Sequence, residues 1–323
     1  MTAPTNEIDA PALSLRHCSV DEYCRASLKC RHNAFWFYQD ISPVFGNFRK
    51  PFQDSEGRWW LRVRQGFAWP VDLLTGFASK GRLPWQYTFF GYQHVVPEGS
   101  PANSALYVNV IALPEFNFRT IKYSKRKMIK QGLKACEIRL LDRLDPHLLD
   151  GMTEAWNSLV KRTGWKWPLT RQQMELRMGE ILDLPGTSTI LAIDQTSGRV
   201  AGFLISKTYG DTSTPDVIAA NADLLHCRPN DVLNYAWLNS CQAIPGVIKA
   251  SHSIKSPTSK LERFKLELGF RPQKFPAYLH ARPGFLPLVR LTQPMMYKRL
   301  AGEPYWEEEQ ASEDKEKLPE KET

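Results

Sequence analysis

The sequence lacks any apolar run long enough to cross a membrane. No window holds the roughly 18 or more apolar residues that a membrane helix needs. The segment from Met1 to Ala12 is polar and acidic, whereas a secretion signal would be basic and then apolar. These two absences predict a cytoplasmic protein without a transmembrane segment. Peripheral contact with a membrane surface remains compatible with the sequence.

Closely spaced metal ligands are also missing. The chain has six cysteines, and Cys18, Cys24 and Cys30 recur at intervals of six residues. Zinc sites use ligand pairs about two to four residues apart. The spacing therefore favours reduced thiols in or near the core, with no metal bound. Without a secretion signal we also expect no disulfides.

Negative charge is scarce except at the C-terminal end. The whole chain has 42 Lys and Arg against 34 Asp and Glu, a net charge of +8, and nine of the acids lie from Glu303 onward beside three lysines. Residues 1–302 therefore carry a net charge of +14. A basic surface of this kind suits nucleic acid, an anionic membrane surface or a phosphorylated substrate.

The length of 323 residues suits two domains of about 130–150 residues each. In the C-terminal half, apolar periodicity and capping signals define the elements clearly. The expected elements are a strand over 135–141, a helix from Asp145-Pro146 to Gly164, a helix capped by Thr170, a hairpin of 188–193 and 200–208, a strand over 217–225, a helix from Pro229, a strand over 247–253, a helix over 256–268 and a strand over 270–281.

The N-terminal half gives weaker signals. Strands are expected over 59–63, 86–96 and 105–113, and helices over 20–31 and 71–79. Gly- and Pro-rich breaks separate these segments. They indicate a mixed α/β region, but the pairing of its strands cannot be read from the sequence.

The helix over 256–268 has clear signals at both ends. Ser256 is a good N-cap and Pro257 suits the first helical turn. Gly269 can adopt the left-handed conformation that ends a helix. A strand follows at once, so this segment should be a short helix with a sharp turn into the sheet.

Lys265 lies in an unusual place on this helix. At about 100° per residue, Leu261, Phe264 and Leu268 form one apolar stripe, and Leu266 extends the apolar arc past Lys265. A lysine inside an apolar arc needs a partner, a route to water or a functional role.

Two segments and their order resemble a known family. The order of strand, helix, helix, three strands, helix, strand, helix and strand resembles the GNAT acyltransferase fold. Phe264-Lys265 with Leu268-Gly269-Phe270 is similar to a signature of the FemAB-like branch, whose members often carry two GNAT-like domains. The basic helix, glycine and strand over 123–138 are similar to the segment that leads into the second such domain. The resemblance covers residues 119–281.

The resemblance implies an α/β fold with a mixed sheet and two GNAT-related domains, of which the N-terminal one is remodelled. The boundaries that follow are a flexible N-terminus over 1–12, a partial GNAT-like domain over 13–118, a basic linking helix over 119–134, a GNAT-like domain over 135–285, an extension over 286–302 and an acidic disordered tail over 303–323.

A stripe of basic residues on the linking helix is a candidate binding site. Arg119, Lys122, Arg126 and Lys130 would lie within an arc of about 80° on a continuous helix. Such a stripe could hold a phosphate, a diphosphate or a carboxylate, or it could be a solvated face. The resemblance implies that this helix lies near the junction of the two domains, where related transferases bind their acceptor.

Lys265 is a candidate catalytic residue. Acyl transfer develops negative charge on a carbonyl oxygen, which an ammonium group could stabilise. The resemblance implies that the Phe-Lys motif binds the acyl donor, so Phe264 is a candidate substrate-binding residue. The alternative for Lys265 is an ion pair with Glu262 or a route to water. His252 on the preceding strand is a candidate general base or a hydrogen-bonded scaffold residue.

The start of the helix at Pro229 departs from CoA-dependent GNAT enzymes. These enzymes use a glycine-rich turn to bind pyrophosphate at a helix N-terminus. Here Pro229 removes an N–H donor, Asp231 adds negative charge, and Asn230 suits an N-cap. The departure argues against acetyl-CoA at this place and is common in the FemAB-like branch.

Two functions remain open. The first is transfer of an acyl or aminoacyl group onto an amine of an anionic small-molecule acceptor, such as a phosphorylated or cell-wall precursor. Acyl-CoA and aminoacyl-tRNA are both candidate donors, so tRNA is a candidate partner. The second is a non-catalytic protein that binds RNA through its positive charge and through aromatic residues such as those of Trp165-Lys166-Trp167. The oligomeric state cannot be read from the sequence.

Overall fold

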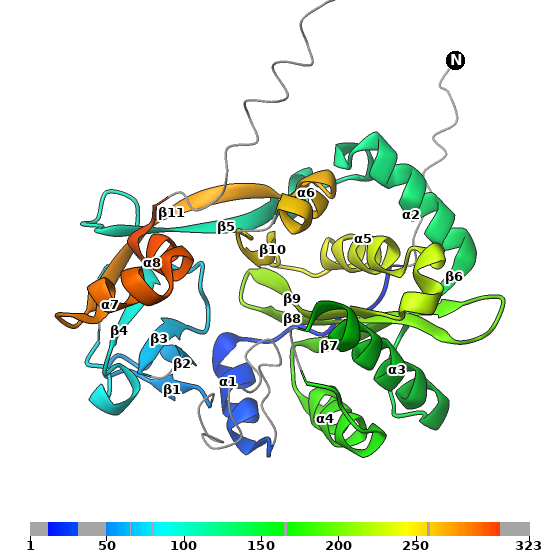
Figure 1. The fold of residues 1–323 in the computed structure, drawn as a ribbon, viewed down its shortest axis with the longest axis horizontal. Coiled ribbons are helices and arrows are strands. Elements are labelled where there is room, and N and C mark those ends of the chain that lie inside the picture. Colours follow the sequence, from blue (N-terminus) through cyan, green and yellow to red (C-terminus); the bar gives the residue numbers. More distant parts are fainter. Residues whose placement is uncertain are drawn as a thin grey trace, which may run out of the picture.

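One mixed sheet of eleven strands forms the centre of the part of the chain that the structure describes, and it runs in the order β1-β2-β3-β4-β11-β5-β10-β9-β8-β7-β6 (Figure 1). The structure is a computed structural model, and it describes residues 12–31, 50–64, 66–78, 81–164, 167–256 and 259–303. The strands are β1 (Phe52–Gln53), β2 (Trp59–Arg64), β3 (Phe67–Pro70), β4 (Gly91–Val95), β5 (Ser104–Ala112), β6 (Cys136–Leu140), β7 (Thr187–Asp194), β8 (Val200–Tyr209), β9 (Thr212–Ala220), β10 (Lys249–Ile254) and β11 (Arg271–Ala281).

Helices cover both faces of the sheet in Figure 1. They are α1 (Val20–Lys29), α2 (Tyr123–Ala135), α3 (Pro146–Thr163), α4 (Arg171–Asp183), α5 (Pro229–Cys241), α6 (Ser259–Glu267), α7 (Phe285–Thr292) and α8 (Pro294–Ala301). The mixed α/β fold is therefore as the sequence predicts.

The C-terminal half has the predicted order of elements. The carboxylate of Asp145 accepts hydrogen bonds from the first backbone N–H groups of α3, and Gly164 ends that helix with a φ of 62°. Thr170 caps α4 through the backbone N–H of Gln173. These side chains satisfy N–H groups that a helix leaves without partners, which is why the predicted boundaries hold here.

Three predicted boundaries in this half are wrong. The strand expected over 217–225 is β9, which ends at Ala220 because Asn221 caps a 3₁₀ turn over 222–227. Asn230 is not an N-cap, because Arg228 takes that position with left-handed angles of 57° and 42°. The basic helix expected from residue 119 is α2, which begins at Tyr123. The N-cap predicted at Ser256 involves residues 257 and 258, which lie outside the described residues.

The N-terminal half differs more from expectation. The helix predicted over 71–79 is wrong, because residues 71–78 form bends and the carboxylate of Asp72 accepts hydrogen bonds from the N–H groups of Leu74 and Thr75. This local turn competes with helix formation. The strand predicted over 86–96 shortens to β4, because residues 85–87 form a 3₁₀ turn. The expected α1, β2 and β5 are present.

The two halves of the chain share the sheet through β11. This strand lies between β4 and β5 and pairs antiparallel with both, with Ala277 opposite Val95 and Ser104. β5 in turn pairs with β10. The most C-terminal strand thus completes the N-terminal part of the sheet. The predicted domain boundaries stay a prediction, and those over 1–11 and 304–323 fall outside the described residues.

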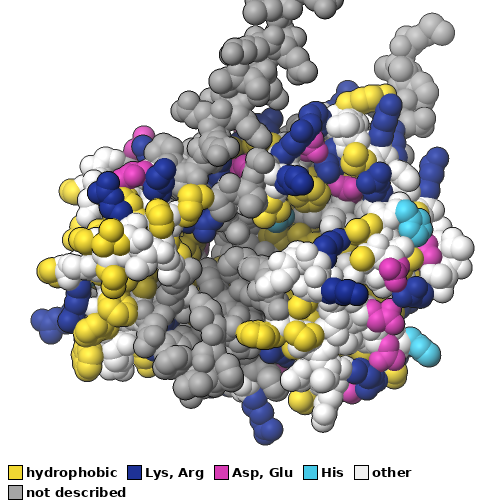
Figure 2. All heavy atoms as spheres, viewed as in Figure 1, with side chains coloured by type: hydrophobic (Ala, Val, Ile, Leu, Met, Phe, Trp, Pro, Cys, Tyr) yellow, Lys and Arg dark blue, Asp and Glu magenta, His cyan; other side chains and the backbone are white. Residues whose placement is uncertain are grey.

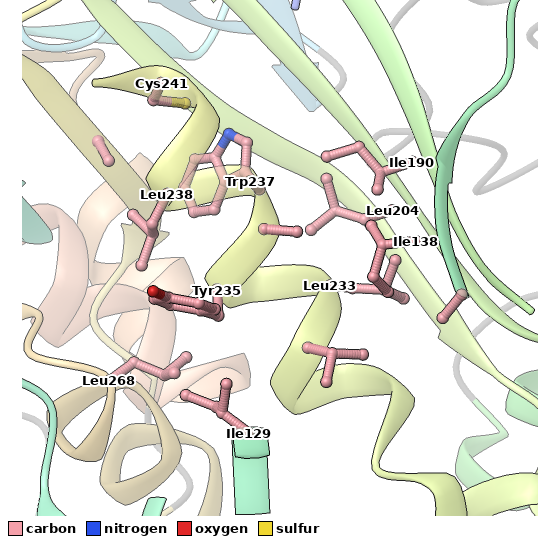
Figure 3. Close-up of a cluster of buried hydrophobic side chains, with 14 of the residues drawn as sticks. Ile129, Ile138, Ile190, Leu204, Leu233, Tyr235, Trp237, Leu238, Cys241 and Leu268 are labelled. Carbon is pink, nitrogen blue, oxygen red and sulfur yellow. The ribbon is translucent and has the colours of Figure 1, made fainter. Parts of the chain in front are cut away.

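The side chains of the central strands alternate between two cores. Ile190 and Leu204 pack with α5 on one face, where Trp237 is fully buried (Figure 3). Leu191 and Phe203 pack with α3 and α4 on the other face. Adjacent residues of a strand point to opposite faces of the sheet. A strand that is buried on both faces therefore has apolar residues at consecutive positions, not only at every second position.

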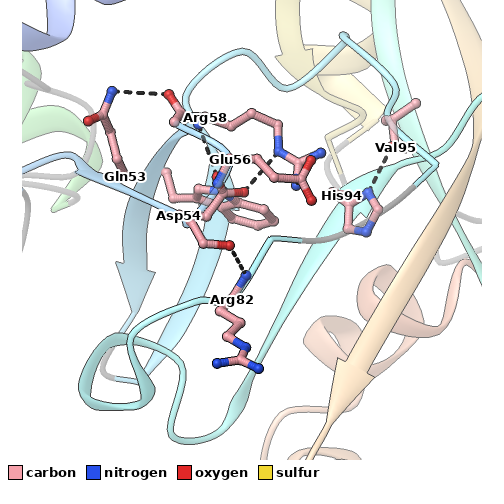
Figure 4. A network of polar contacts seen from close by, with 10 residues as sticks. Gln53, Asp54, Glu56, Arg58, Arg82, His94 and Val95 are labelled. Carbon is pink, nitrogen blue, oxygen red and sulfur yellow. Dashed lines mark hydrogen bonds and ion pairs between the residues drawn. The ribbon is translucent and has the colours of Figure 1, made fainter.

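A buried carboxylate organises the turn between β1 and β2. Asp54 accepts hydrogen bonds from the backbone N–H groups of Glu56 and Arg58, at 2.9 and 3.0 Å, and from the side chains of Arg58 and Trp60, also at 2.9 and 3.0 Å (Figure 4). A carboxylate with this many donors stays ionised and fixes the turn that leads into β2.

Candidate functional site

The strands β9 and β10 separate soon after they meet. Their parallel pairing holds only for Lys249 with Thr212 and for Ala250 with Ser213, although β9 continues to Ala220. On its other side β10 pairs with β5, and the register shifts between Ser251 and Ile254. The sheet is therefore interrupted at the C-terminal end of β10.

A β-bulge marks this interruption. Ser251 pairs with Val110 and Ile254 pairs with Val108, so His252 and Ser253 both face the single residue Asn109. Ser253 has a φ of 60°, which is unfavourable for a residue with a side chain. Bulges and strained residues of this kind are frequent next to functional sites.

The helix α6 places two charged side chains against the bulge. Glu262 and Lys265 are 7% and 2% exposed, whereas Leu261 and Leu266 are 47% and 38% exposed. The apolar stripe predicted through Leu261 is therefore wrong, because the helix turns its charged side chains inward. We call Asn109, His252, Glu262 and Lys265 the β10 polar cluster.

Hydrogen bonds hold part of this cluster. Lys265 Nζ donates to the carbonyl oxygen of Ile254 at 3.3 Å. Glu262 Oε2 accepts from Asn109 Nδ2 at 3.2 Å and from the backbone N–H of Ser256 at 3.0 Å. Among the described residues Lys265 forms no ion pair with Glu262. Neither alternative predicted for Lys265, an ion pair or a route to water, describes its environment.

Three buried polar atoms of the cluster have no hydrogen-bond partner in the described part of the chain. They are Asn109 Oδ1, His252 Nε2 and Glu262 Oε1. A buried polar atom without a partner costs about 1–3 kcal/mol, so such atoms are rare unless a ligand or water meets them. Three of them on neighbouring elements, beside a buried ammonium group, are the features of a binding site.

The electrostatics of the cluster are set by burial. The pKa of Lys265 is lowered to about 8, chiefly by burial; the charge of Glu262 opposes this shift, and the charge of Arg299 contributes to it. Burial and the charge of Lys265 together lower the pKa of His252 to about 3. His252 as a residue is only half-buried, but its Nε2 atom is fully enclosed. At neutral pH the site therefore holds an ammonium group beside a neutral imidazole.

The end of α6 fixes the position of Lys265. Gly269 has a φ of 100°, as the sequence predicts. The N–H of Phe270 donates to the carbonyl of Lys265 at 3.1 Å, and the N–H of Gly269 donates to that of Leu266 at 3.0 Å. These two bonds form a Schellman cap. Phe270 is then fully buried, and its ring contacts the ring of His252 edge-on at 5.3 Å.

The predicted basic stripe is divided between two elements. Arg119 lies exposed on a 3₁₀ turn over 118–120, and Lys122 is the N-cap of α2. Only Arg126 and Lys130 lie within the helix, where they approach the rings of Tyr123 and Phe118. The stripe as one helical arc is therefore wrong, because Ile121 and Lys122 are extended.

Two lysines at the start of α2 reach α6. Lys122 Nζ lies 3.5 Å from a carboxylate oxygen of Glu267. Lys125 is buried; its Nζ lies 2.9 Å from Asp231 and 4.4 Å from the centre of the Phe264 ring. The sequence analysis did not predict a role for Lys125. Its charge is opposite to that of Asp231, and this was the one signal in the sequence that could have indicated the pair. No contact joins the Arg126 side chain to Lys265 among the described residues.

The first turn of α5 does not offer a free anion site. Asp231 is buried there and already paired with Lys125, and Pro229 at the first helical position has no N–H. An anion at a helix N-terminus needs unpartnered N–H groups and no competing negative charge. The geometry agrees with the departure from CoA-dependent enzymes noted in the sequence.

In the GNAT-like class of fold, a helix connects two parallel strands that separate from each other, and a last helix and strand follow. In this chain the two strands are β9 and β10, the connecting helix is α5, and α6 and β11 follow. No protein-family model matches the chain, and no curated protein matches its sequence. Solved structures match it well enough to show the fold.

Two of these structures cover most of the chain. The C-terminal domain of a putative lysylphosphatidylglycerol synthetase from Agrobacterium fabrum is 12% identical, with a TM-score of 0.52 over 84% of this chain and 96% of that one. L-PGS from Bacillus licheniformis is 10% identical, with a TM-score of 0.50 over 90% and 99%. FemX is 11% identical over 61% of this chain and 66% of its own, with a TM-score of 0.44. The chain thus shares the fold of the first two structures, which agrees with the mixed α/β, GNAT-like fold that the resemblance implies.

Neither a membrane-spanning helix nor a metal-binding cluster is present among the described residues. No described helix combines the length and apolar character that crossing a membrane requires. No group of three or more His, Cys, Asp and Glu side chains in the described ranges is arranged to hold a metal ion.

Proposed function

We propose that the chain transfers an acyl or aminoacyl group from an activated carbonyl donor to an amine of an anionic acceptor, with the reaction centre at the β10 polar cluster. The observation that carries the proposal is the group of three buried polar atoms around Lys265 that have no hydrogen-bond partner among the described residues. A structural cluster would satisfy these atoms internally. A binding site leaves them for its ligand.

In this proposal Lys265 stabilises charge. The acceptor nitrogen attacks the carbonyl carbon, the carbonyl oxygen gains negative charge, and the bond to the donor's leaving group then breaks. The Lys265 ammonium is 2% exposed, so water screens it little and it can stabilise that oxygen strongly. Its pKa of about 8 keeps it mostly protonated at pH 7.

Of the two roles predicted for His252, general base or hydrogen-bonded scaffold residue, we do not assign the first. A group with a pKa of about 3 is too weak a base to remove a proton efficiently at neutral pH. Its neutral imidazole can instead orient the acceptor through Nε2. Glu262 Oε1 is the unpartnered carboxylate oxygen of the cluster, and we assign it to accept the proton that the attacking amine loses.

Both donors remain candidates. The paired carboxylate of Asp231 disfavours the usual pyrophosphate position of CoA. The relative from Agrobacterium fabrum is named as a putative lysylphosphatidylglycerol synthetase, which supports an aminoacyl group and an anionic acceptor. Arg119, Lys122, Arg126 and Lys130 stay predicted acceptor-binding residues, and Phe264 a predicted donor contact.

The test measures transfer from labelled aminoacyl-tRNA and from labelled acyl-CoA to acceptors that co-purify with the protein. Lys265→Met should lower kcat at least about a hundredfold, the usual cost of losing one oxyanion-stabilising group. Lys161→Met, at an exposed position of α3, is the matched control and should keep full activity. Transfer that survives Lys265→Met would overturn the assignment of the site.

A second candidate function is non-catalytic binding of RNA. It is favoured by α2, which has five basic residues and no acid over 123–135. In that case Lys127→Glu with Lys130→Glu should abolish RNA binding, which should also fall steeply with salt, while no donor is turned over. Transfer activity in the wild-type chain would exclude this reading as the complete function.

A further inference from the structure

The C-terminal helices leave large apolar side chains exposed. α7 and α8 bury only Val289 and Leu300 of their residues. Leu288, Leu291 and Met295 are 56%, 83% and 43% exposed. Leu288 and Leu291 are three residues apart and lie on one face of α7, and Met295 lies in the first turn of α8. A folded chain gains nothing from exposing them to water.

The exposed apolar surface continues beyond these helices. Phe285, in the first turn of α7, stacks on Phe90 with ring centres 5.2 Å apart, and Phe90 contacts Phe89 edge-on at 5.0 Å. Phe89 is 43% exposed. Figure 2 shows hydrophobic side chains gathered on the side of the molecule where α7 and α8 lie, with Lys and Arg side chains beside them. We call Phe89, Leu288, Leu291 and Met295 the α7 surface.

Exposed cations lie on the segments that carry the α7 surface. Arg282, Arg290 and Lys298 are exposed there, and the Arg282 guanidinium lies 4.5 Å from the centre of the Phe89 ring. The sequence has no Asp or Glu over 73–97 or over 268–302. By contrast, the exposed Leu176 of α4 lies between Glu175 and Arg177. These two segments thus combine exposed apolar groups with charge of one sign.

We propose that the α7 surface binds the anionic face of a lipid bilayer. Leucines and phenylalanine can enter the boundary between headgroups and acyl chains, while the arginines and lysine meet the negative headgroups. A protein partner of ordinary composition would not require the absence of acids from both segments. This inference concerns a surface separate from the β10 polar cluster and does not rest on the proposed function.

The expected binding has two parts. Each cation near an anionic membrane contributes about fivefold in affinity, the factor that corresponds to ~1 kcal/mol. The inserted apolar side chains should contribute at least about tenfold together. The protein should therefore bind vesicles of phosphatidylcholine with 30% phosphatidylglycerol much more tightly than vesicles of phosphatidylcholine alone, and added salt should weaken the binding.

The experiment is vesicle flotation with the full chain and three variants. Leu288→Ser with Leu291→Ser should lower binding to anionic vesicles at least about tenfold, and Arg282→Gln with Arg290→Gln should lower it by about 25-fold. Leu176→Ser is the control with the same chemistry at a distant exposed position. Far-UV circular dichroism of each variant should match the wild type, because the changed side chains are exposed.

Three outcomes would overturn the proposal. The first is equal binding to neutral and anionic vesicles, or to neither. The second is an equal loss of binding in the Leu176→Ser control. The third is a change of oligomeric state in the Leu288→Ser, Leu291→Ser variant, measured by light scattering, which would assign the surface to contact between protein chains.

Discussion

Replacing Lys265 with methionine should stabilise the fold at pH 7 while it abolishes the proposed transfer. The pKa of this lysine falls from its ordinary value of 10.5 to about 8 in the folded protein. The difference corresponds to about 3 kcal/mol that folding loses at neutral pH by burying the ammonium group. Methionine fills a similar volume without that cost. The hydrogen bond to Ile254 is lost, at about 1–2 kcal/mol, so the net gain should be about 1–2 kcal/mol.

Lys207, another buried lysine, provides a matched control. Lys207 Nζ lies 2.8 Å from Asp216 Oδ2, and both side chains are less than 10% exposed. Lys207→Met would remove the ion pair that compensates the buried Asp216 carboxylate, which costs about 3–5 kcal/mol. Two lysines of similar burial should therefore respond to the same substitution with opposite signs. The difference arises because only Lys207 has a direct ionic partner.

Urea unfolding at several pH values measures both effects. The unfolded chain holds the Lys265 proton more tightly than the folded chain, so the cost of burial is fully present below about pH 8 and is relieved as pH rises toward 10.5. The stability difference between Lys265→Met and the wild type should therefore shrink over that interval. If Lys265→Met destabilises the protein as much as Lys207→Met does, then Lys265 is a structural residue and the reasoning fails.

Further predictions concern the reaction and the sheet. The kcat of the proposed transfer should fall as pH rises through about 8, because Lys265 loses the proton that stabilises the carbonyl oxygen; a kcat that rises there would point to Lys265 as a base. Burial raises the pKa of Asp54, but hydrogen bonds led by that of Trp60 outweigh it and lower the pKa. Asp54→Ala should cost about 2 kcal/mol at pH 7 in urea unfolding, and less once the pH falls below the lowered pKa. Gly91→Ala should cost more than Gly99→Ala by calorimetry, because its Cβ would lie 2.1 Å from a carbonyl oxygen of β11, whereas that of Gly99 meets open space.

The C-terminal half of the fold was predictable because its signals are local. Asp145 and Thr170 are caps whose partners lie within three residues along the chain, and Gly164 ends its helix without help from distant residues. Such features act through the backbone next to them. The predicted GNAT-like fold follows from their order, and the fold of the matching solved structures agrees with it.

The N-terminal half could not be predicted because its contacts are distant in the sequence. β4 pairs with β11, almost two hundred residues later, and β5 pairs with both β11 and β10. A sequence pattern shows that a strand exists but not which strand it will meet. The turn at Asp72 adds a second difficulty, because its side chain replaces a helix that the apolar spacing favours.

The candidate site likewise contains residues that the sequence indicated and one residue that only the structure revealed. Lys265, His252 and Glu262 were visible in the sequence as unusual residues near one motif. Asn109 was invisible because it lies on a strand of the other half, and only the pairing of β5 with the bulge of β10 brings it to Glu262. A single polar residue within an apolar strand is a weak signal, but it is the one that could have found Asn109.

The position of Lys265 makes a structural role difficult to sustain. A lysine that serves stability is expected either to reach water or to meet a carboxylate, as Lys125 and Lys207 do at 2.9 and 2.8 Å. Lys265 does neither, and the one carboxylate beside it binds Asn109 and a backbone N–H instead. The fold thus keeps an ammonium group at a cost in stability, next to three polar atoms that have no partner in the part of the chain that the structure describes. That cost is understandable if a ligand carbonyl completes the cluster, because the same desolvation that weakens the fold strengthens the interaction with a developing oxyanion.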